Sequence, residues 1–388
     1  MTTVDVLNQA DPDAPDLADE ATGWRSAYVH IPFCARVCPY CDFAVVTGED
    51  GSAERYVASL LTELRSEPGW EPLDAVAFGG GTPSRLAPRL LGSVVDALRA
   101  HSGLAPGCEV SIEVNPEDVT PELAHGLSAT GITRVSIGAQ SFEPAVLTAL
   151  GRCHRPADIE RGVLALRSAG IEQINIDLIF GTPGETPDTW MTSVEWALAL
   201  DPDHISTYAL TVERGTALSR AVAGGAPAPD PDAQADAWEA AGAIIGRSGL
   251  VRYEVSNHAR PGAVARYNLS VWAGGEYLGL GMGAHRHRDG VRSWNLRRLD
   301  TYIQRLEDDL SPRLGEERLS AAERERERVF LGLRLASGVR PGEPGLRLVE
   351  SPWGRRLFDA GVMTLRDGRL VVTRPLLTDE VQRALMAV

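Results

Sequence analysis

The sequence contains no lysine, because all 38 basic residues in the 388-residue chain are arginine. This absence excludes mechanisms that use a lysine amine as a Schiff-base nucleophile or as an acid–base group. Long apolar runs are also absent, since no stretch reaches the roughly 18 residues of a membrane-spanning helix. The net charge of −15 argues against a broad basic surface. We therefore expect no nucleic-acid partner.

Residues 1–22 have the composition of a disordered leader. They are acidic and rich in Ala, Asp and Pro, and they lack the basic region and apolar core of a signal peptide. Cysteine is scarce as well: the chain has five, an odd number, so we do not expect a disulfide framework. Free thiols suit a reducing compartment, and we expect a cytoplasmic protein.

Three of the five cysteines lie close together. Cys34, Cys38 and Cys41 have the spacing C-x3-C-x2-C, and thiols this near each other bind a metal or an iron–sulfur cluster readily. A [4Fe–4S] cluster is usually held by four thiolates, so three would leave one iron with an open position for a ligand. A zinc site completed by His30 or Asp42 is the alternative that the spacing leaves open.

Repeated β–α units organise the middle of the chain. Six short segments are apolar and rich in β-branched residues, as buried parallel strands are, and stretches with helical periodicity separate most of them. These segments are Tyr28–Phe33, Ala75–Phe78, Val110–Val114, Arg134–Ile137, Ile174–Ile179 and His204–Ala209. They predict an α/β fold with a parallel sheet, in the form of an incomplete (β/α)6 barrel.

Polar or glycine-rich sequence lies at the carboxyl end of nearly every predicted strand, where the chemistry of such barrels is found. The run from Gly79 to Thr82 would let the backbone approach a ligand closely and leave its amides free to bind it. Glu113 and Asp177 are carboxylates in strands whose barrel-facing side should be apolar. Ion pairs with Arg134 or Arg152 are the alternative to ligand contact for these two carboxylates.

The cysteine spacing, with Tyr40 just before the third cysteine, resembles the signature of radical S-adenosylmethionine (SAM) proteins. In that family the amino and carboxylate groups of SAM chelate the open iron. One electron from the cluster then cleaves SAM to a 5′-deoxyadenosyl radical. The resemblance implies a [4Fe–4S] cluster and SAM as cofactors, and an electron donor such as a flavodoxin or ferredoxin as a partner.

Further motifs narrow the resemblance to the family of oxygen-independent coproporphyrinogen III oxidase and the HemW heme chaperones. These motifs are Tyr28-Val-His-Ile-Pro-Phe, Gly79-Gly-Gly-Thr-Pro, Ser111-Ile-Glu-Val-Asn-Pro, Gly138-Ala-Gln-Ser-Phe and Asn175-Ile-Asp-Leu-Ile. The resemblance implies that Cys34, Cys38 and Cys41 are the metal ligands. It also implies that SAM is contacted by Tyr28, Tyr40, Gly80, Gly81, Thr82, Glu113, Gln140, Arg152, Asp177 and Ala209.

Two features resemble HemW more than the oxidase. The oxidase carries a further cysteine two places beyond the third, where this chain has Phe43, and its N-terminal segment is longer. The blocks Tyr253–Gly262 and Tyr277–Ala284 also look like HemW blocks. The resemblance therefore implies a heme chaperone that transfers heme, its cargo, to acceptor apoproteins. Oxidative decarboxylation of coproporphyrinogen in porphyrin biosynthesis is the alternative, and we expect that activity to be absent.

The HemW family typically shows His-Asn-x-x-Tyr-Trp in a block implicated in heme contact. This chain instead reads Tyr267-Asn-Leu-Ser-Val-Trp272, so a tyrosine stands in place of the histidine. Tyrosinate can ligate heme iron, as imidazole can. Our candidates for heme contact are Tyr267, Trp272, His258 and His285. A homodimer is also compatible with the resemblance.

Composition and turn signals suggest four regions. Residues 1–22 form the leader and residues 23–222 the barrel. Residues 223–312, which open with a Gly/Pro/Ala run, form a linker and barrel-capping region. Residues 313–388 contain a charged helix followed by a hairpin signal at Arg366–Arg369, which suggests a small winged-helix-like domain. Because the chain is acidic, a capping or partner-docking role is favoured over DNA binding for this domain.

Overall fold

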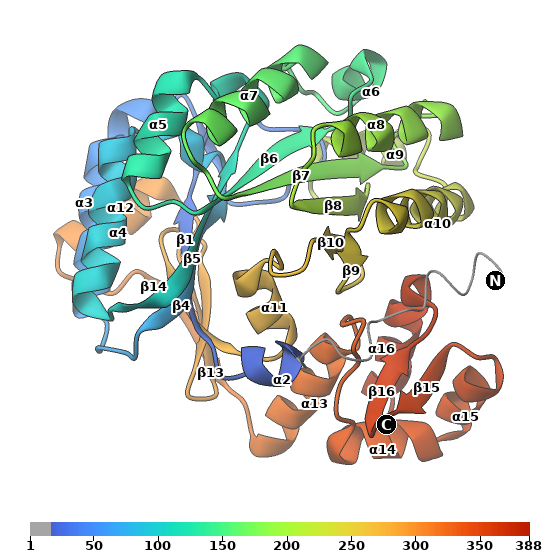
Figure 1. Ribbon diagram of the computed structural model, residues 1–388. Coiled ribbons are helices and arrows are strands. Elements are labelled where there is room, and N and C mark those ends of the chain that lie inside the picture. The colour runs from blue at the N-terminus through green and yellow to red at the C-terminus, as the bar shows by residue number, and fades with distance from the viewer. Residues whose placement is uncertain (1–16) are drawn as a thin grey trace.

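Six parallel strands form the centre of one large sheet in the computed structural model, which describes residues 17–388 (Figure 1). They are β1 (Arg25–Ile31), β4 (Leu73–Gly80), β5 (Leu104–Val114), β6 (Arg134–Gln140), β7 (Gln173–Phe180) and β8 (His204–Ala209). They pair in this order, each parallel to the next. The outer neighbour of β1 is β11 and that of β8 is β10, so the barrel stays open. The predicted six-stranded α/β barrel is confirmed.

Helices cover the outer face of these strands (Figure 1). They are α3 (Ala53–Ser66), α4 (Pro88–His101), α5 (Pro121–Ala129), α6 (Pro144–Ala149), α7 (Pro156–Ser168), α8 (Pro187–Ala199) and α10 (Pro231–Arg247). Proline at the first turn starts all but the first of them, because its missing N–H is not needed there. None of the helices in residues 17–388 is long and apolar enough to cross a membrane.

Side chains alternate between the two faces of the barrel strands. The outward residues, such as Ile112, Val135, Ile176 and Ile205, are apolar and belong to the main core against the helices. The inward residues Ser111, Glu113, Ser136, Asn175, Asp177, His204 and Ser206 are polar and line a cavity. The expectation of an apolar interior was therefore wrong. The physical reason is that the interior of the open barrel is a cavity and not a packed apolar core. Polar side chains there can bond to one another.

Further strands extend this sheet on both sides. On the β8 side lie β10 (Asn257–Ala259) and β9 (Val251–Arg252); on the β1 side lie β11 (Glu276–Leu280), β12 (His285–Arg288), β13 (Val291–Asn295) and β14 (Arg313–Arg318). Helix α9 (Ala217–Ala223) precedes α10, and α11 (Arg266–Trp272) and α12 (Leu299–Glu307) lie between these strands in sequence. Residues 223–312 thus widen the sheet, and β14 places residues 313–318 in it, outside the small domain to which the sequence assigned them.

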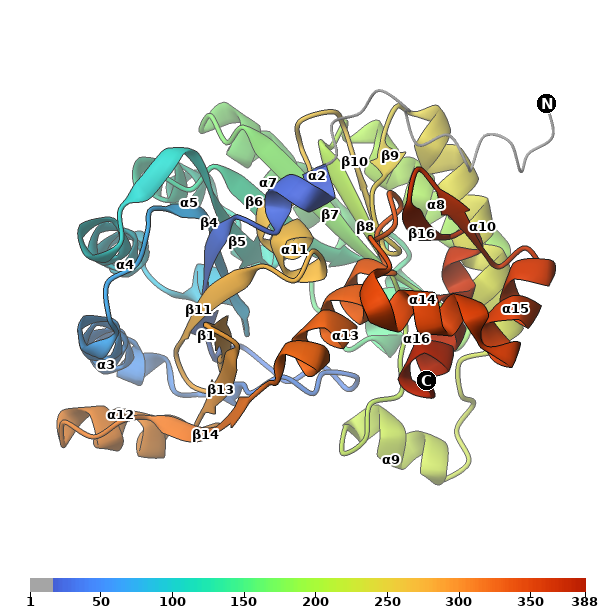
Figure 2. The ribbon, with the colours of Figure 1, turned by 90° about the horizontal axis from the view of Figure 1, so that it is seen from below.

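The end of the chain packs around a core of its own (Figure 2). It comprises α13 (Ala321–Gly332), α14 (Gly342–Glu350), α15 (Pro352–Asp359), the hairpin β15 (Met363–Arg366) and β16 (Arg369–Val372), and α16 (Thr378–Met386). Helix α2 (Leu17–Ala21) lies against this part, since the Asp19 carboxylate pairs with Arg340 at 2.9 Å and with Arg369 at 2.7 Å. Ala21 is fully buried. The leader prediction was therefore wrong for residues 17–22, and residues 1–16 lie outside the described part.

A buried carboxylate joins α3 to the sheet. The Glu63 carboxylate accepts hydrogen bonds from the Tyr302 hydroxyl at 2.5 Å, the Asn295 amide at 2.5 Å and the Gly281 backbone N–H at 2.8 Å. Burial outweighs these donors and raises the pKa of Glu63 to about 7. The folded chain thus holds a proton that the unfolded chain releases at lower pH. This contribution to stability is full below about pH 4 and is lost as the pH rises through about 7.

We predict that Glu63→Gln flattens the pH dependence of stability. The free energy of unfolding of the wild type should fall between about pH 5 and about pH 8 by on the order of 3 kcal/mol more than that of the variant. Denaturant titrations at both pH values measure the difference. Glu71→Gln, which changes an exposed carboxylate paired with Arg25, is the control and should follow the wild type. If the free energy of unfolding changes equally with pH in the wild type and in Glu63→Gln, the raised pKa of Glu63 would be contradicted.

Candidate cofactor-binding site

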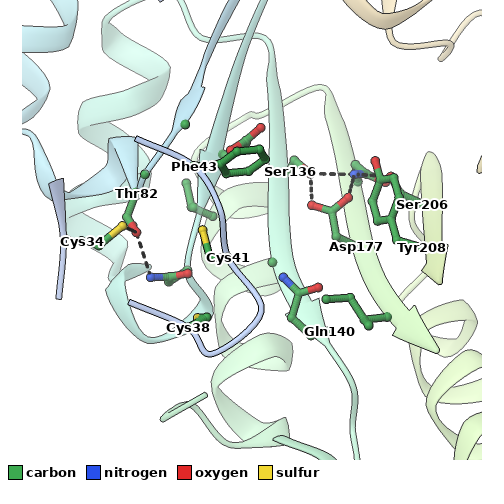
Figure 3. A pocket seen from close by; sticks show the side chains of 18 of the residues that line it. Cys34, Cys38, Cys41, Phe43, Thr82, Ser136, Gln140, Asp177, Ser206 and Tyr208 are labelled. Carbon is green, nitrogen blue, oxygen red and sulfur yellow. Dashed lines mark hydrogen bonds between the residues drawn. The ribbon is translucent and has the colours of Figure 1, made fainter. Parts of the chain in front are cut away.

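One cavity of about 490 Å³ lies at the carboxyl ends of the parallel strands and extends into the barrel (Figure 3). It gathers every residue that the sequence assigned to the cluster or to SAM. Its lining includes Cys34, Cys38, Cys41, Tyr28, Tyr40, Gly80, Gly81, Thr82, Glu113, Gln140, Arg152, Asp177 and Ala209. Side chains from six strands and from the loop after β1 thus face a single space.

The cysteine loop leaves the end of β1 and returns alongside its own start, because the short strands β2 (Phe33–Cys34) and β3 (Val46–Thr47) pair in parallel. All three thiols are free. In residues 17–388 no three His, Cys, Asp or Glu side chains already surround one point as metal ligands. The donors around the sulfurs suit negative charge, since the Thr82 hydroxyl is 3.6 Å from the sulfur of Cys34 and the Arg152 guanidinium is 3.8 Å from that of Cys38.

The histidine of the zinc alternative already has partners at both ring nitrogens. Nε2 of His30 lies 2.7 Å from the Ala44 carbonyl, and Nδ1 lies 3.3 Å from the Tyr28 hydroxyl. Burial lowers the pKa of His30 to about 4, so the ring is neutral and one nitrogen donates while the other accepts. The side chain of Asp42 is exposed. His30 therefore ties the cysteine loop to β1 at Ala44, and a zinc ligand role would break that tie.

The glycine run was expected to offer free amides, and this was wrong. The N–H of Gly81 donates to the Ile31 carbonyl and that of Thr82 to the Phe33 carbonyl, both at 2.8 Å. The N–H of Gly80 donates to the Glu113 carboxylate. These bonds attach the run to β1, to β2 and to β5. The amides of Gly80, Gly81 and Thr82 therefore already have partners, and the Thr82 carbonyl accepts the Arg85 N–H at 3.0 Å.

The two inner carboxylates have no ion-pair partner among the described residues. Arg134 pairs with Glu109 at 2.8 Å, and the Arg152 guanidinium donates to the Asn115 side chain at 2.6 Å. Burial and the charge of Asp177 raise the pKa of Glu113 to about 7, although water reaches its carboxyl through the cavity. Burial also raises the pKa of Asp177. The ion-pair alternative is therefore contradicted, and both carboxylates face the cavity.

The four candidates for heme contact are not gathered in this cavity. Tyr267 on α11 lines it, and its ring stacks on that of Tyr28 at a centroid distance of 5.8 Å. Trp272, also on α11, packs under the Arg334 guanidinium at 4.4 Å. His258 is buried in β10, and His285 on β12 stacks on Trp294 at 6.0 Å. Of the four, Tyr267 alone is among the residues that line the cavity.

Several polar residues of the cavity were not recognised from the sequence. Asn115, Ser136, Asn175, His204 and Ser206 all line it. Asn115 bonds both to Thr82, at 3.3 Å, and to Arg152, so it connects the two side chains that lie beside the sulfurs. The signal that could have found the strand residues is their period of two, in register with Asp177 on β7 and across β6 and β8.

The comparisons with known proteins decide the family. The radical SAM superfamily signature matches residues 28–197. Heme chaperone HemW of Mycobacterium tuberculosis strain H37Rv is 39% identical over 392 residues, covering 98% of this chain and 100% of that protein. The chain belongs to the HemW family of radical SAM proteins. HemW of Bacillus subtilis is 33% identical over 323 residues, covering 81% of this chain and 84% of that protein. Radical SAM membership implies a [4Fe–4S] cluster and SAM.

A solved structure shares the fold of this HemW family member. Coproporphyrinogen III oxidase (HemN) of Escherichia coli superposes with a TM-score of 0.79 at 22% sequence identity, covering 94% of this chain and 90% of that one. The likeness extends through the small C-terminal domain as well as the barrel.

We predict that Gly80→Ala destabilises the protein in the absence of any ligand. Gly80 has φ +105°, and a Cβ there would lie 2.4 Å from the His30 ring. The free energy of unfolding should fall by more than about 1 kcal/mol. Gly51→Ala is the matched control, because no atom lies within 4 Å of its added Cβ. An unchanged denaturation midpoint in Gly80→Ala would contradict the role given to this glycine.

Proposed function

We propose that this protein is a heme chaperone that holds a [4Fe–4S] cluster and SAM in the barrel cavity, binds heme as cargo and passes it to acceptor apoproteins. The observation that carries the proposal is similarity over the whole chain, since 98% of it aligns with 100% of a protein named heme chaperone HemW. The aligned residues thus include β9–β14 and the small C-terminal domain as well as the barrel. A reducing, cytoplasmic compartment suits the free thiols.

Cys34, Cys38 and Cys41 are the proposed cluster ligands. When bound, the cluster and SAM supply one-electron chemistry, and an electron donor such as a flavodoxin or ferredoxin is the proposed partner for it. The residues of the chain hold and orient these groups. Thr82 donates toward the sulfur of Cys34, and Arg152 places a positive charge beside that of Cys38.

SAM is proposed to lie across the strand ends, beside the cluster ligands. The carbonyls of the glycine run suit its amino group. Asp177 is held in place by the Ser136 hydroxyl at 2.5 Å and the Asn175 amide at 2.8 Å, and it faces the same space as Gln140 (Figure 3). An acceptor oriented in this way loses little freedom when a ligand binds. Gln140 has φ +64°, a conformation that costs energy in a non-glycine residue and is common at ligand sites.

Heme is proposed to contact Tyr267, the candidate that borders the cavity. Its phenol is buried against Tyr28, and burial raises the pKa of Tyr267 well above its ordinary value. Ligation by the tyrosinate would therefore depend on iron to displace the proton. The proposed small domain and a homodimer would present the cargo to its acceptor.

Phe43 favours the chaperone over the alternative, coproporphyrinogen oxidation. This side chain is 63% exposed and lines the mouth of the cavity, at the position where the oxidase carries its further cysteine. An exposed phenyl ring beside the cluster loop offers apolar contact and no thiol. The loop thus has an aromatic surface in place of a possible additional ligand or reactive group.

We predict that anaerobically reconstituted protein binds about four irons, with charge-transfer absorption. Replacing Cys34, Cys38 or Cys41 by serine should abolish this binding, because each removes one of three thiolates. Cys108→Ser and Cys153→Ser are the controls and should retain the cluster. Iron analysis and absorption spectra measure the result. Stoichiometric zinc without iron in protein purified without oxygen would contradict the cluster assignment.

We also predict saturable heme binding that depends on Tyr267. Tyr267→Phe should change the heme absorption spectrum, because it removes the proposed ligand oxygen, and should leave cluster and SAM binding intact. The matched control is Tyr277→Phe, whose ring lies 6.0 Å from that of Tyr267 and is not part of the cavity lining. Absence of saturable heme binding by the wild type would contradict the chaperone. Identical heme spectra for the wild type and Tyr267→Phe would show that Tyr267 is not the ligand of the heme iron.

A further inference from the structure

A continuous chain of hydrogen bonds crosses the inside of the barrel and ends at Asp177. The Tyr253 hydroxyl lies 2.9 Å from Nε2 of His204, and Nδ1 of His204 lies 2.7 Å from the side-chain oxygen of Asn175. The Asn175 amide nitrogen in turn donates to the Asp177 carboxylate at 2.8 Å and to the Ser136 hydroxyl at 2.6 Å. Ser136 donates to the other Asp177 oxygen at 2.5 Å, and the Ser206 hydroxyl lies 3.0 Å from the same Asn175 amide nitrogen.

The direction of each bond follows from the chemistry of its groups. Burial and the charge of Arg134 lower the pKa of His204 well below its ordinary value, so the ring is neutral and carries one proton. The oxygen of Asn175 can only accept, so the ring proton lies on Nδ1 and Nε2 accepts from the Tyr253 hydroxyl. Replacing Tyr253 by phenylalanine would leave Nε2 of His204, a buried acceptor, without its partner. The Tyr253 hydroxyl is thus linked to the Asp177 carboxylate through His204 and Asn175.

Tyr253 is also attached to two other parts of the molecule. Its hydroxyl accepts the backbone N–H of Ala265 at 3.4 Å, directly before α11 begins at Arg266. Its backbone carbonyl accepts the N–H of Ala336, which follows α13 in the C-terminal part, at 3.0 Å. Helix α11 carries Tyr267, whose ring stacks on Tyr28 in the cavity. One tyrosine thus bonds to the barrel interior, to the start of α11 and to the C-terminal part.

We propose that Tyr253 and His204 are positioning residues for Asp177, and that this chain couples SAM binding in the cavity to the placement of α11 and of Tyr267. The inference rests on the proposed function, because it takes Asp177 as a SAM contact and Tyr267 as a heme contact. SAM bound at Asp177 holds Asn175, His204 and Tyr253 in one arrangement, and the Tyr253 hydroxyl holds the start of α11. By reciprocity, heme at Tyr267 alters SAM affinity by the same factor.

The test compares Tyr253→Phe with Asp177→Asn in cluster-loaded protein, with SAM affinity measured anaerobically by calorimetry. Tyr253→Phe removes one oxygen outside the SAM contacts and should weaken SAM binding about 3- to 10-fold. The double variant should bind SAM no more weakly than Asp177→Asn, because both changes act through one carboxylate. Tyr302→Phe is the matched control: it removes another buried hydroxyl bonded to a carboxylate, that of Glu63, and should leave SAM affinity unchanged.

Heme titrations with and without SAM test the coupling itself. SAM should change the heme affinity of the wild type and of Tyr302→Phe by the same factor. In Tyr253→Phe the change in heme affinity caused by SAM should be smaller. If Asp177→Asn weakens SAM binding and Tyr253→Phe does not, the positioning role is refuted while the proposed site stands. If Asp177→Asn itself leaves SAM affinity unchanged, the proposed SAM site is refuted. Equal SAM effects on heme binding in all three proteins would refute the coupling.

Discussion

The structure depends on one constraint: the polar side chains inside the open barrel have to satisfy one another. Outward residues of the strands form the apolar core with the helices. The inward face carries carboxylates, amides, hydroxyls and an imidazole around one cavity. Because unsatisfied polar groups are costly when buried, the side chains of Ser136, Asn175, Asp177, His204 and Ser206 bond to one another. This network fixes Asp177 and leaves it without a cationic partner in the described part of the chain.

Contacts between neighbouring segments also hold the cysteine loop. His30 bonds to Ala44 across the loop, and β2 pairs with β3 at its two ends. The glycine run packs against this assembly so closely that a Cβ at Gly80 or Gly81 would meet His30 or Pro32 at under 3 Å. The three thiols therefore lie on a loop whose base is closed by these contacts, beside the donors Thr82 and Arg152. Packing alone therefore requires glycine at these two positions.

Much of the barrel could be predicted from the sequence, because its strands have an apolar face of buried core residues and its helices have apolar stripes. The strands β9–β14 could not be predicted from the sequence. All but β14 have five residues or fewer, which is too short for a clear alternation of apolar and polar residues. Their neighbours in the sheet are set by contacts across the chain, such as the pairing of β11 with β1. Sequence also placed the site residues together, because parallel strands bring their carboxyl ends to one edge.

What the sequence could not show was how the polar groups are used. The amides of Gly81 and Thr82 look free in a glycine-rich turn, but they donate to carbonyls of Ile31 in β1 and Phe33 in β2, about 50 residues earlier in the chain. His204 stands at the start of a predicted strand with no motif around it, and only the structure places its ring between Asn175 and Tyr253. The four heme candidates lie within 28 residues of one another in sequence, yet they are spread over α11, β10 and β12, and only Tyr267 lines the cavity.

We propose that this fold, shared with an oxidase, holds heme and transfers it. The most direct measurement is anaerobic incubation of the cluster-loaded protein with coproporphyrinogen III, SAM and a reductant, with release of carbon dioxide quantified. For a heme chaperone we expect no release above that of a Cys38→Ser variant, which lacks a proposed cluster ligand. Carbon dioxide released over many turnovers, accompanied by decarboxylated porphyrinogen, would contradict it.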